Sequence, residues 1–197
     1  MDWAIKNSNR NWREVIFSDE SALRINGFIR KKWIHKNNQI IERTVKYPLK
    51  MNIWGCFFKD ELGPIYIFPE NMNVDKYIQI LETNLIPFIE NSKKKLIFQH
   101  DNDPKHKAIK TTQFLEDNDV NVLEWPSCSP DLNPIENIWG ILKERVRKRK
   151  PKNKNDFIKI ITDEWLLLDK KLLKSLINSM PKRIQQVIEN NGDVIMY

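Results

Sequence analysis

The order of short β-type runs and helical patterns constrains the fold of this chain most strongly. The first third of the sequence holds β-prone runs at residues 13–18, 22–28, 30–35, 51–58 and 64–68. The first run is predicted to stop at Asp19, and Asn26-Gly27 is a strong turn signal. Strand and helix patterns then alternate from Val74 onward. This order predicts an α/β fold in which helices pack on a mixed sheet.

The later elements are recognised by periodicity and capping. Apolar residues at helical spacing follow Val74, and Pro87 is expected to kink or end that helix. The next predicted elements are a buried strand at 95–99, a helix capped by Asp103-Pro104, a strand at 120–124 and a helix opened by Asn133-Pro134. The last of these helices carries one apolar stripe, formed by Ile135, Ile138, Trp139, Leu142 and Val146.

Beyond Pro151 the pattern is helical throughout. Helices are predicted at 157–168, 171–179 and 181–190, with a break at Pro181 and an end at Gly192. We therefore expect residues 1–150 to form one domain and residues 151–197 to form a helical extension packed on it.

Charge is concentrated in two segments. The net charge is +7, and residues 24–50 and 143–154 each carry +7, so the remainder carries −7. Basic segments beside an acidic remainder suit a protein that grips a phosphate backbone and holds cations in a carboxylate site. A solvated surface with a nuclear import signal at 143–154 explains the charge equally well.

Other features of the composition limit the class of protein. Cys56 and Cys128 lack the spacing of a disulfide framework or a zinc site, which indicates a reducing compartment. No run approaches the ~20 apolar residues that span a bilayer, and the N-terminus has no signal-peptide core. We expect a soluble, intracellular protein without membrane contact.

Three carboxylates stand where metal chemistry would place them. Asp19 follows the first strand, Asp101 follows the strand at 95–99, and Glu136 lies in the first turn of a helix. If the two strands are neighbours, the aspartates lie about one strand spacing of ~4.8 Å apart, and Glu136 could close the site. Carboxylates are ligands for Mg²⁺ or Mn²⁺, and two such ions ~3.5 to 4 Å apart can clamp a phosphodiester.

Each carboxylate also has a purely structural explanation, which is the stronger one when the residues are taken singly. Asp19 could simply end a strand, and Asp101 could form an Asx-turn. Glu136 stands three residues after Asn133 and could complete a capping box.

Taken together, four motifs resemble those of the Tc/mariner superfamily of DDE transposases. They are Phe-Ser-Asp-Glu-Ser at 17–21, Trp-Gly-Cys at 54–56, Asp-Asn-Asp-Pro-Lys-His at 101–106 and Ser-Pro-Asp-Leu-Asn-Pro-Ile-Glu-Asn-Ile-Trp at 129–139. The 34 residues between Asp101 and Glu136 match the interval of one large branch of that superfamily. The likeness runs from about Trp12 to the C-terminus. It implies an RNase H-like, five-stranded mixed sheet flanked by helices.

The resemblance also implies an activity. It makes Asp19, Asp101 and Glu136 the catalytic and metal-binding triad of a transposase that uses two Mg²⁺ ions, with Mn²⁺ as a substitute. Such an enzyme hydrolyses a DNA phosphodiester and joins the exposed 3′-hydroxyl to target DNA, often at TA. The implied partners are double-stranded DNA and possibly a second copy of the chain, and the implied location is the nucleus, or the cell interior in a prokaryote.

Two other functions stay open at this point. One is a catalytically silent, domesticated or truncated DNA-binding module of the same fold, against which the complete triad argues. The other is a different RNase H-like nuclease or resolvase, against which the Pro-Asp-Leu-Asn-Pro-Ile-Glu context argues. The family reads inverted repeats through N-terminal helix-turn-helix modules, but only 18 residues precede Asp19. An excised domain, a truncated copy and a domesticated protein all fit.

Several residues are candidates for DNA contact. The segment at about 24–50 lies where mariner-like transposases carry a hairpin or clamp. The full set comprises Arg30, Lys31, Lys32, Lys105, His106, Lys143, Arg147, Lys148, Arg149 and Lys150. His106 could instead orient Asp101, cap a helix or lie on the surface.

The helix after Pro134 has one further feature. Glu136, Gly140, Lys143 and Arg147 share one of its faces. Gly140 there suggests either close approach of a ligand or tight packing against another helix. Asp131 and Asn133 are expected to shape the turn before Glu136, and Trp139 to lie in the core.

Overall fold

A five-stranded mixed sheet forms the centre of the molecule, as expected from the sequence. The computed structural model describes residues 1–25, 49–92 and 94–195. The strand order is β3-β2-β1-β4-β5, with antiparallel β1–β2 and β2–β3 pairs and parallel β1–β4 and β4–β5 pairs. The strands are β1 (Val15–Ile25), β2 (Leu49–Phe58), β3 (Glu61–Phe68), β4 (Ile97–Gln99) and β5 (Asn121–Val122).

The first strand is longer than predicted. β1 does not stop at Asp19 but continues to Ile25, because β2 pairs with it along this whole length, with Asp19 opposite Gly55. The start of the run predicted as a separate strand at 22–28 is therefore the end of β1. The turn at Asn26-Gly27, the run at 30–35 and the basic residues Arg30, Lys31 and Lys32 lie outside the described residues.

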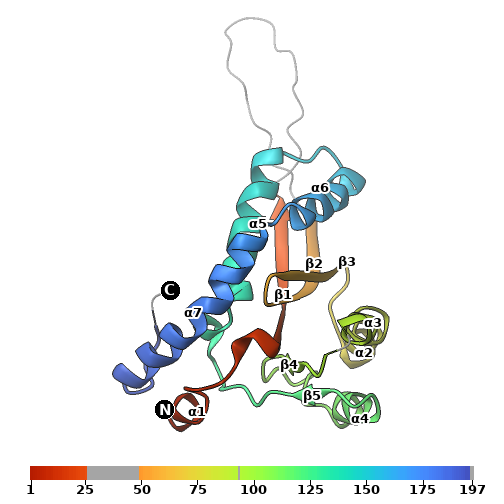
Figure 1. The fold of residues 1–197 in the computed structure, drawn as a ribbon. Helices are drawn as coiled ribbons and strands as arrows, with labels where there is room; N and C mark the ends of the chain where they lie inside the picture. Colours follow the sequence, from red (N-terminus) through yellow and green to blue (C-terminus); the bar gives the residue numbers. More distant parts are fainter. Residues whose placement is uncertain (26–48, 93, 196–197) are drawn as a thin grey trace, which may run out of the picture.

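Helices cover both faces of the sheet (Figure 1). Strand alternation sends Val15 and Phe17 into one hydrophobic core and Ile16 into the other. The first core is closed by α5 (Ile135–Arg149), α6 (Lys154–Leu166) and α7 (Lys170–Glu189). The second is closed by α2 (Val74–Ile80), the π-helical turn η2 (Leu81–Leu85), α3 (Ile86–Ser92) and α4 (Ile109–Asp117).

Two prolines act differently in this framework. The helical run continues through Pro87 to Ser92, so the predicted end there is wrong. The π-helical turn η2 just before Pro87 fits the loss of one helical hydrogen bond, since proline has no N–H to donate. Pro181 lies inside α7, so the predicted break there is wrong. Met180 and Ile184, on either side of it, are buried, and this packing offsets the cost of about 3 kcal/mol for an internal proline.

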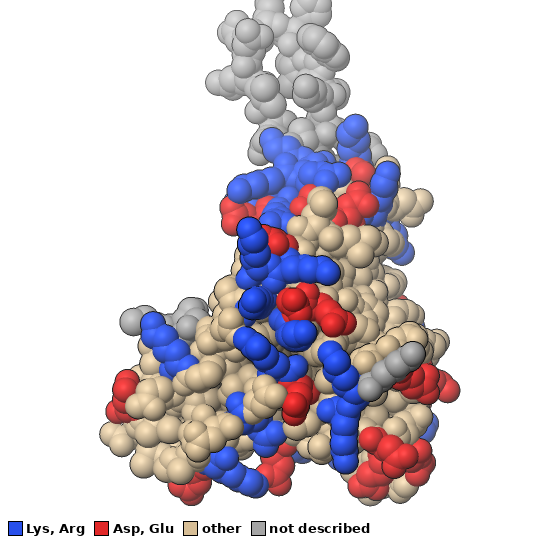
Figure 2. Space-filling view, in the orientation of Figure 1, with Lys and Arg blue, Asp and Glu red and all other residues tan. Residues whose placement is uncertain are grey.

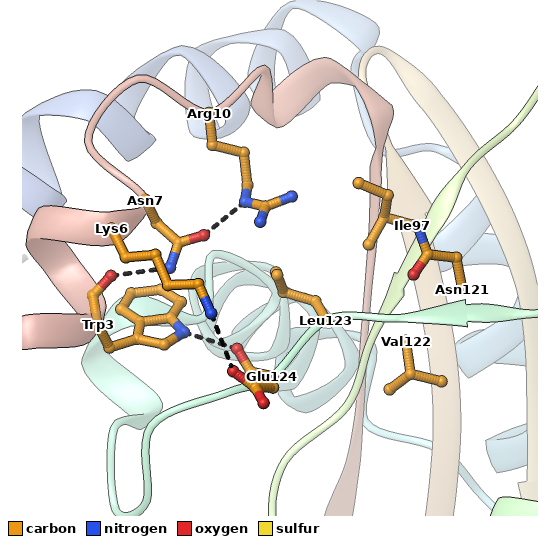
Figure 3. A pocket seen from close by; sticks show the side chains of 9 residues that line it. All are labelled: Trp3, Lys6, Asn7, Arg10, Ile97, Asn121, Val122, Leu123 and Glu124. Atoms are coloured by element: carbon orange, nitrogen blue, oxygen red, sulfur yellow. Dashed lines mark hydrogen bonds and ion pairs between the residues drawn. The ribbon is translucent and has the colours of Figure 1, made fainter.

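The N-terminal helix α1 (Asp2–Lys6) is anchored beside the edge strand β5 (Figure 3). The indole Nε1 of Trp3 donates to the carbonyl oxygen of Glu124 at 2.6 Å, and Lys6 pairs with the Glu124 carboxylate at 3.4 Å. These residues line a hollow of about 210 Å³ to which none of the three candidate carboxylates contributes. None of the described helices is both long enough and apolar enough to cross a bilayer.

Candidate active site

The sheet brings the two aspartates to one place. β1 and β4 are parallel neighbours, with Phe17 opposite Gln99. Asp19 lies two residues after Phe17, and Asp101 lies two residues after Gln99. The strand adjacency required for a shared cation site is therefore present. Ser18 strengthens this contact, because its hydroxyl donates to the carbonyl oxygen of Gln99 at 2.8 Å.

The third carboxylate arrives on α5, and Asn133 sets where that helix begins. The side-chain amide of Asn133 donates to the carbonyl oxygen of Ser18 at 3.1 Å, and its Oδ1 accepts from the backbone N–H of Ile135 at 3.3 Å. Asn133 thus joins the start of α5 to the residue before Asp19. Glu136 follows in the first turn of the helix.

The C-terminal helix supports the same turn. The buried guanidinium of Arg183 donates to the carbonyl oxygen of Asp131 at 2.7 Å and to Oδ1 of Asn137 at 2.6 Å. The Asp131 carboxylate accepts from the backbone N–H of Ile195 at 2.8 Å. Helix α7 and the residues after it therefore hold the segment that presents Glu136, a contribution for which the sequence gives no local signal.

One pocket of about 390 Å³ contains all three carboxylates. Asp19, Asp101 and Glu136 line it together with the loop at 125–130 and Asn133. Glu136 is exposed, and within residues 1–25, 49–92 and 94–195 its carboxylate accepts no hydrogen bond, so the capping-box explanation is wrong. In the same residues, no group of three or more His, Cys, Asp or Glu side chains is already arranged to hold a metal ion.

Asp19 is partly buried beside the ring of Trp139. Its Oδ2 accepts a hydrogen bond from the indole Nε1 of Trp139 at 3.2 Å. Burial raises the pKa of Asp19 to about 8, and the nearby charges of Glu20, Glu136 and Asp101 add to this effect. Among the residues that the structure describes, Asp19 thus forms no ion pair with a Lys, Arg or His side chain.

Asp101, in contrast, is bonded to a histidine that carries a positive charge. Its Oδ1 lies 2.7 Å from Nδ1 of His106 and accepts from the backbone N–H of Asp103 at 3.0 Å. The hydrogen bond from His106 lowers the pKa of Asp101 to about 2, although burial opposes the shift. The Asx-turn considered for Asp101 is therefore present, and it coexists with a place in the pocket.

His106 bridges two acidic residues. Its Nε2 lies 3.1 Å from Oε1 of Glu20, on the side opposite Asp101. Burial alone would lower the pKa of His106, but the hydrogen bonds to Asp101 and Glu20 outweigh it and raise the pKa to about 9. At neutral pH both ring N–H groups donate. The ring is only 3% exposed and stacks on His100 at 4.9 Å, which fits orientation of Asp101 better than contact with DNA.

Glu20 was not among the sequence candidates. As the neighbour of Asp19 on β1, it projects to the other face of the strand, where it pairs with His106 and with Lys105 at 3.3 Å. Strand alternation through Asp19 was the signal for it, but the prediction ended the strand there. Lys105 also pairs with Asp103 at 2.8 Å, so its ammonium is engaged within the protein.

The local structure around Asp103 differs from the prediction. Asp103 caps a single turn, accepting from the backbone N–H of Lys105 at 2.9 Å, and α4 begins only at Ile109. The turn folds back because Asp101, Asp103 and His106 bond one another. This arrangement places His106 beside Asp101 and not on a helix.

The predicted basic face of α5 is exposed. Lys143, Arg147, Lys148 and Lys150 are exposed, and Figure 2 shows Lys and Arg side chains gathered around the end of α5 and down the same face. Arg149 instead bonds to Glu164 at 2.8 Å. A Cβ added to Gly140 would meet nothing within 4 Å, so tight packing within the chain does not explain this glycine.

Comparisons with known proteins agree with this architecture. The model of a family described as DDE superfamily endonuclease matches residues 14–158. The Tc1 transposase of Caenorhabditis elegans is 32% identical over 196 residues, covering 95% of this chain and 72% of the relative. The Tc3 transposase of the same organism is also 32% identical, covering 100% of this chain and 62% of the relative.

Solved structures share the fold at low sequence identity. The catalytic domain of Mos1 mariner transposase superposes with a TM-score of 0.76 at 17% identity, covering 98% of this chain and 90% of that one. A Mos1 paired-end complex with the left transposon end gives 0.80 at 17% identity, and there this chain spans 60% of the transposase. The match to the family model and the identity to nematode transposases place this chain in the DDE superfamily of endonucleases, as the catalytic domain of a Tc1/mariner-type transposase.

Proposed function

We propose that this chain cleaves and joins DNA phosphodiester bonds at the pocket lined by Asp19, Asp101 and Glu136. The observation that carries the proposal is that the three carboxylates lie together in one pocket. Three carboxylates from β1, from the turn after β4 and from α5 meet in one open pocket, although 34 residues separate the last two and 81 separate the first two. We take residues 1–150 as the catalytic unit and residues 151–197 as the extension that supports it.

The residues in the pocket fit a divalent cation, Mg²⁺ or Mn²⁺. Carboxylate oxygens are the ligands these ions prefer, and Mg²⁺ in phosphoryl-transfer sites uses one or two carboxylates plus substrate phosphates and water, which suits an open pocket. The raised pKa of Asp19 arises from burial beside other carboxylates, a condition that a bound cation relieves. Solved Mos1 paired-end complexes with Mg and with Mn share this fold. We propose two ions per site.

The chain's own residues would divide the work as follows. When bound, the ions would stabilise charge on the attacking and leaving oxygens of the phosphodiester. Asp19, Asp101 and Glu136 hold them, and protonated His106 keeps Asp101 ionised and oriented. Asn133 keeps the start of α5 against β1, so that Glu136 stays in register with the aspartates.

We propose double-stranded DNA as the substrate. The exposed basic residues Lys143, Arg147, Lys148 and Lys150 lie along the helix that begins with Glu136, and Gly140 leaves room between them for a phosphate backbone. The fold is shared with a Mos1 strand transfer complex, which supports joining of DNA to a target. We further propose TA target sites and action as a homodimer, which only the resemblance of the sequence motifs implies. The nucleus is the proposed location, since the relatives above are nematode transposases.

Nicking of supercoiled plasmid with Mn²⁺ tests the proposal. Asp19→Asn, Asp101→Asn and Glu136→Gln should each abolish metal-dependent nicking while the circular dichroism spectrum stays unchanged. Glu116→Gln, at an exposed carboxylate of α4, is the matched control and should nick normally. Normal nicking by any triad variant removes that residue from the site. DNA binding without nicking in the wild-type chain would identify a silent binding module.

A salt titration tests the DNA surface. If Lys143, Arg147, Lys148 and Lys150 contact phosphates, the slope of log affinity against log salt should shrink by about 0.9 for each one replaced with Gln. Arg149→Gln is the control, because Arg149 pairs with the largely buried carboxylate of Glu164 on α6, whereas Lys148 pairs only with the exposed Glu144 on its own helix. An unchanged slope in the other variants would exclude this face.

A further inference from the structure

Trp139 contacts the candidate site directly, although its ring is buried. It lies on α5 one turn after Glu136, is only 1% exposed, and donates its single N–H to Oδ2 of Asp19 at 3.2 Å. A tryptophan needed only for apolar packing would not have to direct this group at a candidate metal ligand.

The ring is held in place from two sides. Trp139 stacks on Trp165, with ring centroids 5.4 Å apart and an interplanar angle of 27°. The other contact is with Gly55 on β2, the residue that pairs with Asp19 on β1. A Cβ on Gly55 would stand 2.9 Å from Cη2 of Trp139 and 3.1 Å from Cη2 of Trp165. The absence of a side chain at Gly55 therefore makes room for the indole beside Asp19.

We propose that Trp139 is a positioning residue for the reaction: its indole N–H orients the Asp19 carboxylate and couples it to Glu136 on the same helix. This inference rests on the proposed function of Asp19 as a metal ligand. A hydrogen bond to one carboxylate oxygen restricts rotation of the group without introducing a charge that would compete with a cation. Because Glu136 and Trp139 share one helical turn, the same bond keeps α5 in register with β1.

Trp165 provides a matched control for the alternative that Trp139 only fills the core. Both tryptophans are 1% exposed, they stack on each other, and each donates one indole hydrogen bond. Trp165 donates to the carbonyl oxygen of Gly63 at 3.0 Å and not to a carboxylate. Trp139→Phe and Trp165→Phe each keep an aromatic ring in the stack and remove one N–H, so a purely structural role predicts similar effects.

Activity is measured as Mn²⁺-dependent nicking, with thermal unfolding as the check on folding. Trp139→Phe should lower kcat by about 10- to 100-fold, the range typical of groups that orient metal ligands, with little change in the KM for DNA. It should also weaken Mn²⁺ binding to the DNA-free chain. Trp165→Phe should stay within about threefold of wild type in both. Equal losses in the two variants at equal unfolding temperature would overturn the inference.

Indole N–H resonances of the metal-free protein give a readout that is independent of activity. The resonance that disappears in Trp139→Phe should shift in Asp19→Ala, whereas the resonance that disappears in Trp165→Phe should not. An unmoved Trp139 resonance would show that no such hydrogen bond exists. If the wild-type chain fails to nick DNA, the proposed function fails, while the resonance shift and Mn²⁺ affinity still decide whether Trp139 orients Asp19.

Discussion

Asp19 lies on β1 and Asp101 in the turn after the neighbouring strand β4, yet the protein holds them in opposite ways. Asp19 sits among buried groups, receives a neutral indole hydrogen bond and has a pKa raised to about 8. Asp101 is half exposed, bonds to protonated His106 and has a pKa lowered to about 2. Within residues 1–25, 49–92 and 94–195, Asp101 pairs with a positive side chain and Asp19 does not.

The difference shows that two aspartates lining one pocket can have very different pKa values. Asp101 is ionised at neutral pH whether or not a cation is present, because His106 compensates its charge. Burial and three nearby carboxylates disfavour the anion of Asp19 and raise its pKa, so a positive charge brought near it would favour ionisation. Within the described residues, one pocket thus combines an aspartate with a lowered pKa and an aspartate with a raised pKa.

The largest expected effect is on the pKa of His106, the residue that bonds to Asp101. Its folded-state pKa of about 9 lies above the ordinary value of 6.5, so its stabilising contribution is complete below about pH 6.5 and is lost as pH rises through 9. This contribution is on the order of 3 kcal/mol. Histidine NMR titration of the metal-free chain should place His106 near 9.

The same titration of two variants compares how Asp101 and Asp19 affect the pKa of His106. Asp101→Asn should lower the pKa of His106 toward 6.5, because it removes the charged acceptor. Asp19→Asn should leave it almost unchanged, since Asp19 does not contact the ring. If both substitutions shifted His106 equally, the two aspartates would share one electrostatic environment and the contrast would fail.

An intermediate effect is expected from Gly55→Ala on the Asp19 side. The added methyl would collide with the stacked, buried rings of Trp139 and Trp165, one of which would have to shift. Overpacking of this kind costs about 1 to 3 kcal/mol. Urea unfolding should show this loss, and nicking should fall as well because Trp139 is displaced from Asp19. Unchanged stability would mean that the rings are not confined against the strand.

The smallest effect is expected on the outer face of the same helix. Gly140 is exposed, and an added Cβ would meet nothing, so Gly140→Ala should raise the free energy of unfolding by about 0.5 to 1 kcal/mol. The same substitution should weaken DNA binding if the phosphate backbone passes close to this glycine. Urea unfolding and a binding titration measure the two effects. A stabilised variant with normal affinity would reduce Gly140 to a neutral surface position.

Sequence patterns predicted much of the fold because local periodicity reports which face of an element is buried. The stripe from Ile135 to Val146 is buried, and the strands containing Cys56 and Phe98 lie within the β-type runs predicted at 51–58 and 95–99. The errors occurred where distant packing outweighed local signals. β2 extends β1 past Asp19, and burial on both sides of Pro181 keeps α7 continuous.

The sequence by itself identified the three carboxylates of the candidate site, since the spacing and context of Asp19, Asp101 and Glu136 could be recognised along the chain. Only the tertiary structure decided how each carboxylate behaves. Trp139, 120 residues after Asp19, supplies its hydrogen bond, and Glu20, 86 residues before His106, completes the bridge to Asp101. Protonation depends on burial and on charges within a few ångströms, and those neighbours are chosen by the folded chain and not by the local sequence.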